Sequence, residues 1–136
     1  MDKRLIKRIA IALCVGPLLW VLFLFYCRPV VALHYSARAT ESIGFFFMID
    51  YATRKQGMEP GETVVIPTPM FPERDLWILL SFPFDSKDSF EIRKPFSRVD
   101  VCIGAGAKVE RTEIRHGFFD RFTEPREPCE PPTSKR

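Results

Sequence analysis

Histidine is scarce in this chain of 136 residues, and the two that are present, His34 and His116, stand alone in the sequence. Neither lies near a cysteine at the spacing of metal ligands, and the four cysteines include no Cys-x-x-Cys pair. These are the patterns from which zinc sites are built. We therefore expect neither a bound metal nor a cofactor.

A large excess of charge of one sign is also lacking. The chain has 20 Lys and Arg against 17 Asp and Glu, a net charge of +3, and the charges are spread evenly. Proteins that bind nucleic acid concentrate basic residues on one surface, so nucleic acid is not expected as a partner. Internal repeats are absent too, and the length allows one domain at most.

The sequence has no Gly-x-Ser-x-Gly motif, and neither histidine has a context that suggests a Ser-His-Asp triad. A nucleophilic serine in this chain would need a different base. A lysine can act as that base if burial in an apolar site depresses its pKa from about 10.4, so that some neutral amine exists near pH 7.

What the chain does have is a long apolar run near its N-terminus, which carries no charge from Ile9 to Cys27. As a helix this run would span about 28 Å, close to the hydrocarbon thickness of a bilayer. Lysines and arginines crowd residues 3–8, whereas Arg28 is the one basic residue that follows closely. The positive-inside rule predicts a cytoplasmic basic stub (1–8), a transmembrane helix (9–27) and a domain in the bacterial periplasm, anchored in the inner membrane by a single pass.

A cleaved signal peptide is the competing interpretation of the same run. Residues 37–39, Ala-Arg-Ala, would serve as a small-residue cleavage site. However, the apolar run is longer than the usual signal-peptide core, and this site lies far beyond its end. An uncleaved anchor in the lipid bilayer is therefore favoured.

The four cysteines fall into two groups. Cys14 and Cys27 belong to the apolar run, where each would pack as a small apolar residue. Cys102 and Cys129 would lie outside the cytoplasm, where an oxidising environment would allow a disulfide between them.

The sequence after the apolar run predicts a small antiparallel β domain. The predicted fold class is therefore mainly β, behind one transmembrane helix. Short β-branched or aromatic runs bounded by glycine and proline are typical of strands. The last two predicted strands form a hairpin around Gly104-Ala105-Gly106. The domain is expected over residues 28–122, and the proline-rich residues 123–136 are expected to be a disordered tail. The predicted strands are 44–49, 62–67, 76–82, 98–103 and 107–115.

Three stretches resemble the TraF-type conjugative-transfer peptidases, which are relatives of type I signal peptidases and use a serine/lysine pair. In that family a membrane anchor is followed by the nucleophilic serine and then by a strand that closes near prolines. The matching stretches are Thr40-x-Ser42, Phe47-Met48-Ile49, and Gly61-Glu62-x-Val64-Val65-Ile66-Pro67-x-Pro69. The resemblance covers roughly residues 1–110, and the chain looks like a degenerate member.

The resemblance implies that Ser42 is the nucleophile of a serine endopeptidase and that Lys94 is the general base. The substrate would then be an exported precursor, such as a pilin, of a conjugation or secretion system. The lysine column of the family holds Ser97 here, and Lys94 stands three residues earlier, on the opposite face of an extended strand. An alternative is therefore a catalytically inactive relative, a single-pass structural or partner-binding subunit of the same machinery. A third reading is a small membrane protein unrelated to the family.

Overall fold

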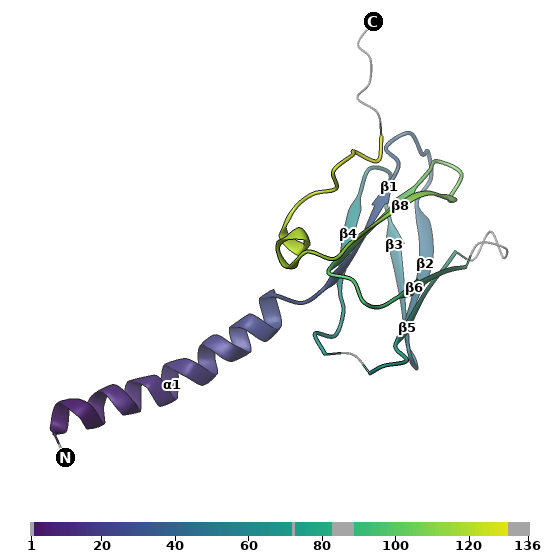
Figure 1. Ribbon diagram of the computed structural model, residues 1–136. Helices are drawn as coiled ribbons and strands as arrows, with labels where there is room; N and C mark the ends of the chain where they lie inside the picture. Colours follow the sequence, from purple (N-terminus) through teal and green to yellow (C-terminus); the bar gives the residue numbers. More distant parts are fainter. Residues whose placement is uncertain (1, 72, 83–88, 131–136) are drawn as a thin grey trace, which may run out of the picture.

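The computed structural model describes residues 2–71, 73–82 and 89–130 (Figure 1). Within these ranges the chain forms one long helix, eight strands and a short 3-10 helix. In chain order they are α1 (Lys3–Tyr26), β1 (Val30–Tyr35), β2 (Ile43–Ile49), β3 (Ala52–Met58), β4 (Thr63–Pro67), β5 (Trp77–Ser81), β6 (Phe90–Arg93), β7 (Arg98–Ile103), β8 (Val109–Arg115) and η1 (Phe118–Phe122).

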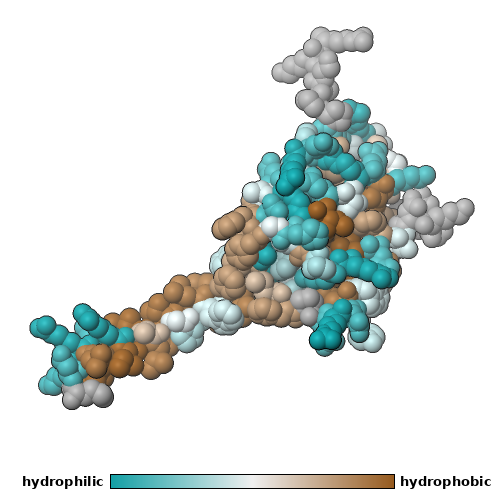
Figure 2. All heavy atoms as spheres, viewed as in Figure 1, coloured by the Kyte–Doolittle hydropathy of each residue, from teal (hydrophilic) through white to brown (hydrophobic). Residues whose placement is uncertain are grey.

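Helix α1 extends away from the domain and contacts it near its C-terminal end, and none of its residues is buried (Figures 1 and 2). The Asp2 side chain caps its first turn by accepting a hydrogen bond from the Arg4 backbone N–H at 3.1 Å. At the other end, the Cys27 N–H donates to the Phe23 carbonyl at 2.9 Å. With 24 residues, α1 is long and apolar enough to cross a membrane.

The eight strands form two four-stranded sheets, with the orders β4-β1-β7-β8 and β3-β2-β5-β6. Every strand pair is antiparallel except β1 with β7, which is parallel. The two sheets share one hydrophobic core, to which the first contributes Val31, Leu33, Val99 and Val101 and the second contributes Phe45, Phe47, Ile78 and Leu80. The predicted fold class, a mainly β domain behind one N-terminal helix, is confirmed.

Strand β2 shows how the sequence pattern positions side chains. Successive side chains in a strand point to opposite faces. Accordingly, Phe45 and Phe47 are buried in the core, whereas Phe46 is partly exposed on the other face. This alternation, expected from the three consecutive phenylalanines, is confirmed.

The predicted strands at 44–49, 62–67, 76–82, 98–103 and 107–115 correspond to β2, β4, β5, β7 and β8; the bounds of β7 agree, and no end of the others differs by more than two residues. The hairpin of β7 and β8 forms as expected, with an irregular register at Cys102 and Ile103. Three further strands were not predicted from the sequence. Strand β1 lies before the first predicted strand, β3 is exposed along almost all its length, and β6 has only four residues.

The C-terminal segment differs from the prediction of a disordered tail. Residues 123–130, here called the strap, have no helix or strand, but they are fastened to the sheet that contains β8. Arg111 pairs with Glu127 at 2.9 Å, and a disulfide joins Cys102 to Cys129 with a Cα–Cα distance of 5.4 Å. The prolines prevent helix or strand formation in the strap, but the disulfide and the ion pair hold it against the sheet. Residues 131–136 lie outside the described residues.

Candidate functional site

Ser42 immediately precedes β2 and lines a hollow together with Tyr35, the last residue of β1, whereas α1 precedes the first residue of that strand. Its side chain is exposed, in a shallow hollow lined by Tyr35, Thr40 and residues 105–107 of the β7–β8 turn. The Tyr35 hydroxyl donates to the Glu41 carbonyl at 2.9 Å, and burial together with the Glu41 carboxylate raises the pKa of Tyr35. No lysine is among the described residues that line this hollow.

Lys94 lies between β6 and β7, with its side chain partly buried. Its Nζ donates to Thr68 Oγ1 at 3.2 Å and to the Pro69 carbonyl at 3.0 Å, and it lies 4.7 Å from the centre of the Phe96 ring. Burial, and to a smaller extent the nearby charge of Arg121, lowers the pKa of Lys94 to about 8. The amine is therefore mostly protonated near pH 7 and acts as a donor.

The structure does not bring Ser42 and Lys94 together. The Thr68 hydroxyl beside Lys94 donates to the carbonyl of Pro29, which immediately precedes β1. The hollow around Ser42 instead contains Tyr35, the last residue of β1. Since a strand rises about 3.3 Å per residue, Pro29 and Tyr35 are about 20 Å apart. The predicted serine/lysine dyad is not formed.

Two other hydroxyls near Lys94 have structural roles. Ser97, in the lysine column of the resembled family, is 2% exposed, and its hydroxyl donates to the Gly117 carbonyl at 2.5 Å. Thr68 is 1% exposed, and its proton is held by the Pro29 carbonyl at 2.9 Å. A nucleophile must reach the substrate and give its proton to a base, and neither hydroxyl meets those conditions.

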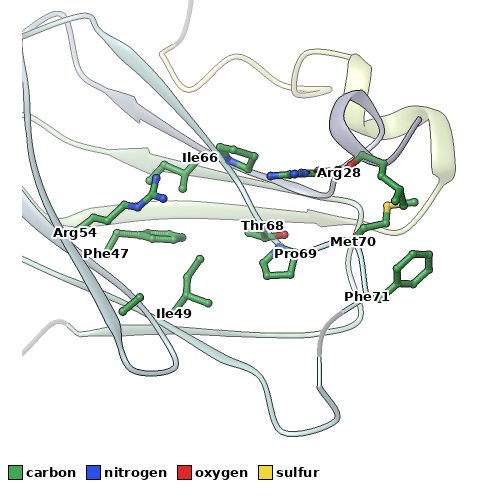
Figure 3. Close-up of a pocket in the computed structure, with 12 residues that line it drawn as sticks. Arg28, Phe47, Ile49, Arg54, Ile66, Thr68, Pro69, Met70 and Phe71 are labelled. Atoms are coloured by element: carbon green, nitrogen blue, oxygen red, sulfur yellow. Dashed lines mark hydrogen bonds between the residues drawn. The ribbon is translucent and has the colours of Figure 1, made fainter. Parts of the chain in front are cut away.

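A cleft of about 520 Å³ lies beside the end of α1 (Figure 3). Its walls come from α1, from β2 to β4, and from the residues that follow β4. Most of the lining is apolar. The apolar lining residues are Leu24, Phe47, Ile49, Ala52, Ile66, Pro67, Pro69, Met70 and Phe71.

The cleft lies where the two sheets meet at their edges. Strands β3 and β4 are the outer strands of their sheets, so within the described part of the chain one side of each has no neighbouring strand. A smaller hollow of about 90 Å³ continues between these two strands and shares Phe47, Arg54, Ile66 and Pro67 with the cleft. The two hollows together form a groove along the free edges of β3 and β4, here called the edge groove.

The charges in the edge groove are positive. Arg28 and Arg54 extend into the cleft from opposite sides (Figure 3). The Arg28 Nε donates to the Leu24 carbonyl at 3.1 Å, and its guanidinium lies 5.1 Å from the centre of the Phe25 ring. No acidic residue is among the described residues that line either hollow. The edge groove therefore suits an apolar ligand that carries a negative charge.

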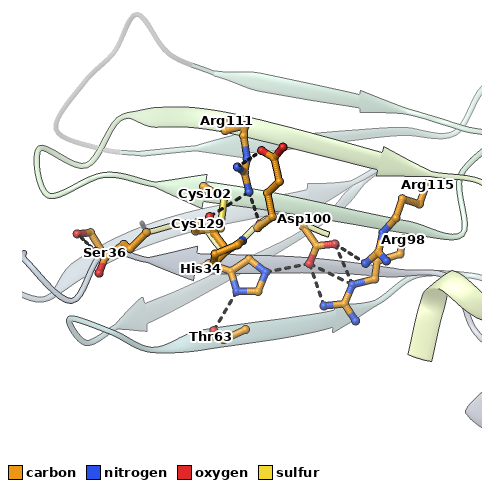
Figure 4. Close-up of a disulfide and its surroundings, with 12 residues drawn as sticks. His34, Ser36, Thr63, Arg98, Asp100, Cys102, Arg111, Arg115 and Cys129 are labelled. Atoms are coloured by element: carbon orange, nitrogen blue, oxygen red, sulfur yellow. Dashed lines mark hydrogen bonds and ion pairs between the residues drawn. A yellow bond between two sulfur atoms is a disulfide. The ribbon is translucent and has the colours of Figure 1, made fainter. Parts of the chain in front are cut away.

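A second cluster of charged groups is buried under the strap (Figure 4). Asp100, 1% exposed, accepts hydrogen bonds at 2.8 Å from His34 Nε2, Arg98 Nη2 and Arg115 Nη2. Burial alone would raise the pKa of Asp100, but the bonds from these three partners outweigh it and hold the pKa far below its usual range. Because the carboxylate is surrounded by its partners, this cluster acts as a structural brace.

Comparison of the chain with protein-family models, with curated proteins and with solved structures finds no match. The resemblance to TraF-type peptidases therefore stays a prediction. Within the described residues, the His, Cys, Asp and Glu side chains also form no group of three that could hold a metal ion.

Sequence reasoning missed the edge groove. Its walls come from parts of the chain that are far apart in the sequence. In addition, β3 lacks the alternation of apolar and polar residues from which a strand can be predicted. One local signal was present. Met70 and Phe71 follow Pro67-Thr68-Pro69, and an exposed aromatic residue directly after a rigid proline stretch is suited to recognition. Phe71 is 72% exposed.

Proposed function

We propose that the protein is a single-pass membrane protein whose β domain binds an extended segment of an exported partner protein in the edge groove. In this proposal α1 crosses the bacterial inner membrane with its basic N-terminus in the cytoplasm, and the β domain lies in the periplasm. The partner would belong to a conjugation or secretion system. The protein would hold such a partner and not cleave it.

The observation that carries the proposal is the apolar groove between two free strand edges. An extended peptide that enters such a groove gains backbone hydrogen bonds from an edge strand, while pockets on the floor select its side chains. The two hollows share four lining residues and are both lined by β3 and β4, so a strand-like ligand could lie along these strands. Arg28 and Arg54 would pair with an acidic group on that ligand.

Peptidase chemistry has weaker support. Ser42 and Lys94 lie at opposite ends of β1, and Lys94 donates both of its described hydrogen bonds to oxygen atoms near the cleft. General-base catalysis requires the base to lie within hydrogen-bond reach of the proton that it removes. A binding role does not need this arrangement.

Photo-crosslinking from the rim of the cleft tests the proposal. We expect a photoreactive aromatic residue at position 71 to crosslink one protein partner in intact cells, and the same residue at Ile114, exposed on β8, to give no such product. Ala52→Trp should abolish the crosslink because Ala52 lines the cleft. Thr53→Trp, on the same strand but not part of the lining, should leave it unchanged.

Two results would contradict the proposed function. One is a crosslink from position 71 that survives Ala52→Trp, since the partner would then not occupy the cleft. The other is a partner whose proteolytic processing stops in Ser42→Ala, since this would support the peptidase function instead.

A further inference from the structure

The short helix η1 presents three phenylalanine side chains to solvent. Phe118, Phe119 and Phe122, here called the aromatic platform, are 41%, 77% and 56% exposed. A contiguous exposed aromatic cluster is unfavourable in water and marks an interaction surface. The Asp120 carboxylate accepts a hydrogen bond from the Gly117 N–H at 2.9 Å, so η1 is capped and holds the platform in place.

The aromatic platform is continuous with the apolar surface of α1. The rings of Phe118 and Phe23 are stacked, with centroids 6.2 Å apart, and Phe23 belongs to the uncharged run of the helix. Figure 2 shows the hydrophobic surface of α1 extending onto the adjacent part of the domain. If α1 lies in a bilayer, the platform is therefore held at the level where the helix emerges.

Cationic side chains border the same surface. The Arg121 guanidinium lies 4.3 Å from the centre of the Phe118 ring, and its Nη1 donates to the Cys27 carbonyl at the end of α1. The Nε of Arg121 is buried with no partner among the described residues. Lys94 Nζ donates to the Pro69 carbonyl, and Arg121 Nη1 lies 3.9 Å from the sulfur of the next residue, a methionine, so the two cations flank the same short segment. These positive groups would complement lipid phosphates at the depth where aromatic rings meet the headgroups.

We propose that the aromatic platform, with Arg121 and Lys94 at its border, docks the β domain onto the surface of the bilayer that α1 crosses. The phenylalanine rings enter the interface and the two cations contact lipid phosphates, as in peripheral membrane anchors. This inference rests on the anchoring part of the proposed function. Docking would fix the orientation of the edge groove, whose opening lies beside the same end of α1.

Depth-dependent quenching by brominated lipids tests this docking on the full chain in nanodiscs. The parent protein contains Trp20 in α1 and Trp77 in β5, and Phe119→Trp adds a reporter on the platform. The matched control is Thr40→Trp, which adds an exposed reporter at the end of the domain far from α1. We expect lipid bromine to quench the additional emission of Phe119→Trp strongly and that of Thr40→Trp hardly at all.

The charge contribution is tested in nanodiscs that contain phosphatidylglycerol. A cation near an anionic surface contributes about 1 kcal/mol, which corresponds to about a fivefold change in an equilibrium constant. Adding Arg121→Gln to Phe119→Trp should therefore shift the balance of docked and undocked domain about fivefold towards undocked. In nanodiscs of phosphatidylcholine alone the shift should be smaller.

Two outcomes would overturn the inference, and they can be told apart. If Trp20 is quenched in the parent but Phe119→Trp is quenched no more than Thr40→Trp, α1 is anchored and the domain does not dock. If Trp20 itself is not quenched, the anchor that the proposed function requires is absent as well. Protection of Phe119→Trp from both lipid bromine and aqueous iodide would also overturn docking, because it would indicate that a protein covers the platform.

Discussion

Asp100 shows how single residues stabilise the sheet under the strap. Its carboxylate is 1% exposed, and its hydrogen-bond partners include the guanidinium groups of Arg98 and Arg115, which are also buried. The His34 Nε2 donates to the same carboxylate, while His34 Nδ1 lies 3.0 Å from Thr63 Oγ1. The ring therefore links β7 to β4 across β1. Removing one charged member of such a cluster leaves the charges of the others buried without a counter-charge.

We expect Asp100→Asn to lower the free energy of unfolding by about 3–5 kcal/mol, the usual cost of breaking a buried ion pair from one side. The matched control is Glu91→Gln, which removes the partner of Arg93 in an exposed pair and should change stability little. Chemical unfolding of the full chain in detergent, followed by circular dichroism, measures both variants.

The pH dependence of the stability of Asp100→Asn tests whether the loss of the carboxylate charge causes the destabilisation. Because the folded-state pKa of Asp100 is depressed, its contribution is fully present above the unfolded-state value of about 3.9 and is lost as the pH falls below it. Asparagine does not titrate, so the stability difference between parent and variant should narrow below about pH 4. A constant difference from pH 7 to pH 3 would show that packing, and not charge, is responsible.

At the scale of elements, the strap is held to the β domain mainly by covalent and ionic bonds. Apart from the disulfide, its described contacts to β8 include the bond from Arg115 Nη1 to Thr123 Oγ1 at 2.8 Å and the pair of Arg111 with Glu127. A disulfide stabilises by restricting the unfolded chain. Its contribution can therefore be tested separately from the packing of the core.

Cys129→Ser should destabilise the domain by about 3.5 kcal/mol, the loop-closure value for cysteines separated by 27 residues. It should also expose the strap to proteolysis, since only noncovalent contacts, among them hydrogen bonds from Arg111 and Arg115 and the ion pair with Glu127, would then hold it. Cys14→Ser is the control, because Cys14 is a free and exposed cysteine of α1. The inference about the strap would be contradicted if both variants unfolded at the same denaturant concentration.

The elements also show what the sequence could predict. A short apolar run identified β2, and alternation next to glycine identified β7 and β8. In β7 the alternation does not separate a buried face from an exposed one, because Arg98 and Asp100 are buried in the charged cluster while Val99 and Val101 are buried in the core. Strand β3 has no such pattern, since its side chains are exposed and it is held by backbone pairing with β2. The separation of Ser42 from Lys94 also could not be predicted from local sequence, because it depends on β1, which is not among the predicted strands.

At the scale of the whole molecule, β1 joins the membrane-spanning candidate to the core. It begins four residues after α1 ends and lies between β4 and β7 in its sheet. Val31, Ala32 and Leu33 are fully buried. A signal peptidase that cut after Ala39 would remove this strand, and the sheet would lose its connection between β4 and the β7–β8 hairpin. The fold therefore argues against a cleaved signal peptide.

We accordingly expect the protein in membranes to retain its N-terminal segment, with α1 intact and the β domain outside the cytoplasm. Mass spectrometry of the purified protein should find peptides from residues 28–38, which cleavage after Ala39 would remove. A reporter fused after Arg136 that is active only outside the cytoplasm should give signal, and Cys102 and Cys129 should be oxidised, because disulfides persist in that compartment. The reversed orientation would leave this pair in a reducing environment and place the basic residues 3–8 outside, against the positive-inside rule. A cytoplasmic reporter signal, or a mature N-terminus near Thr40, would show that the proposed topology is wrong.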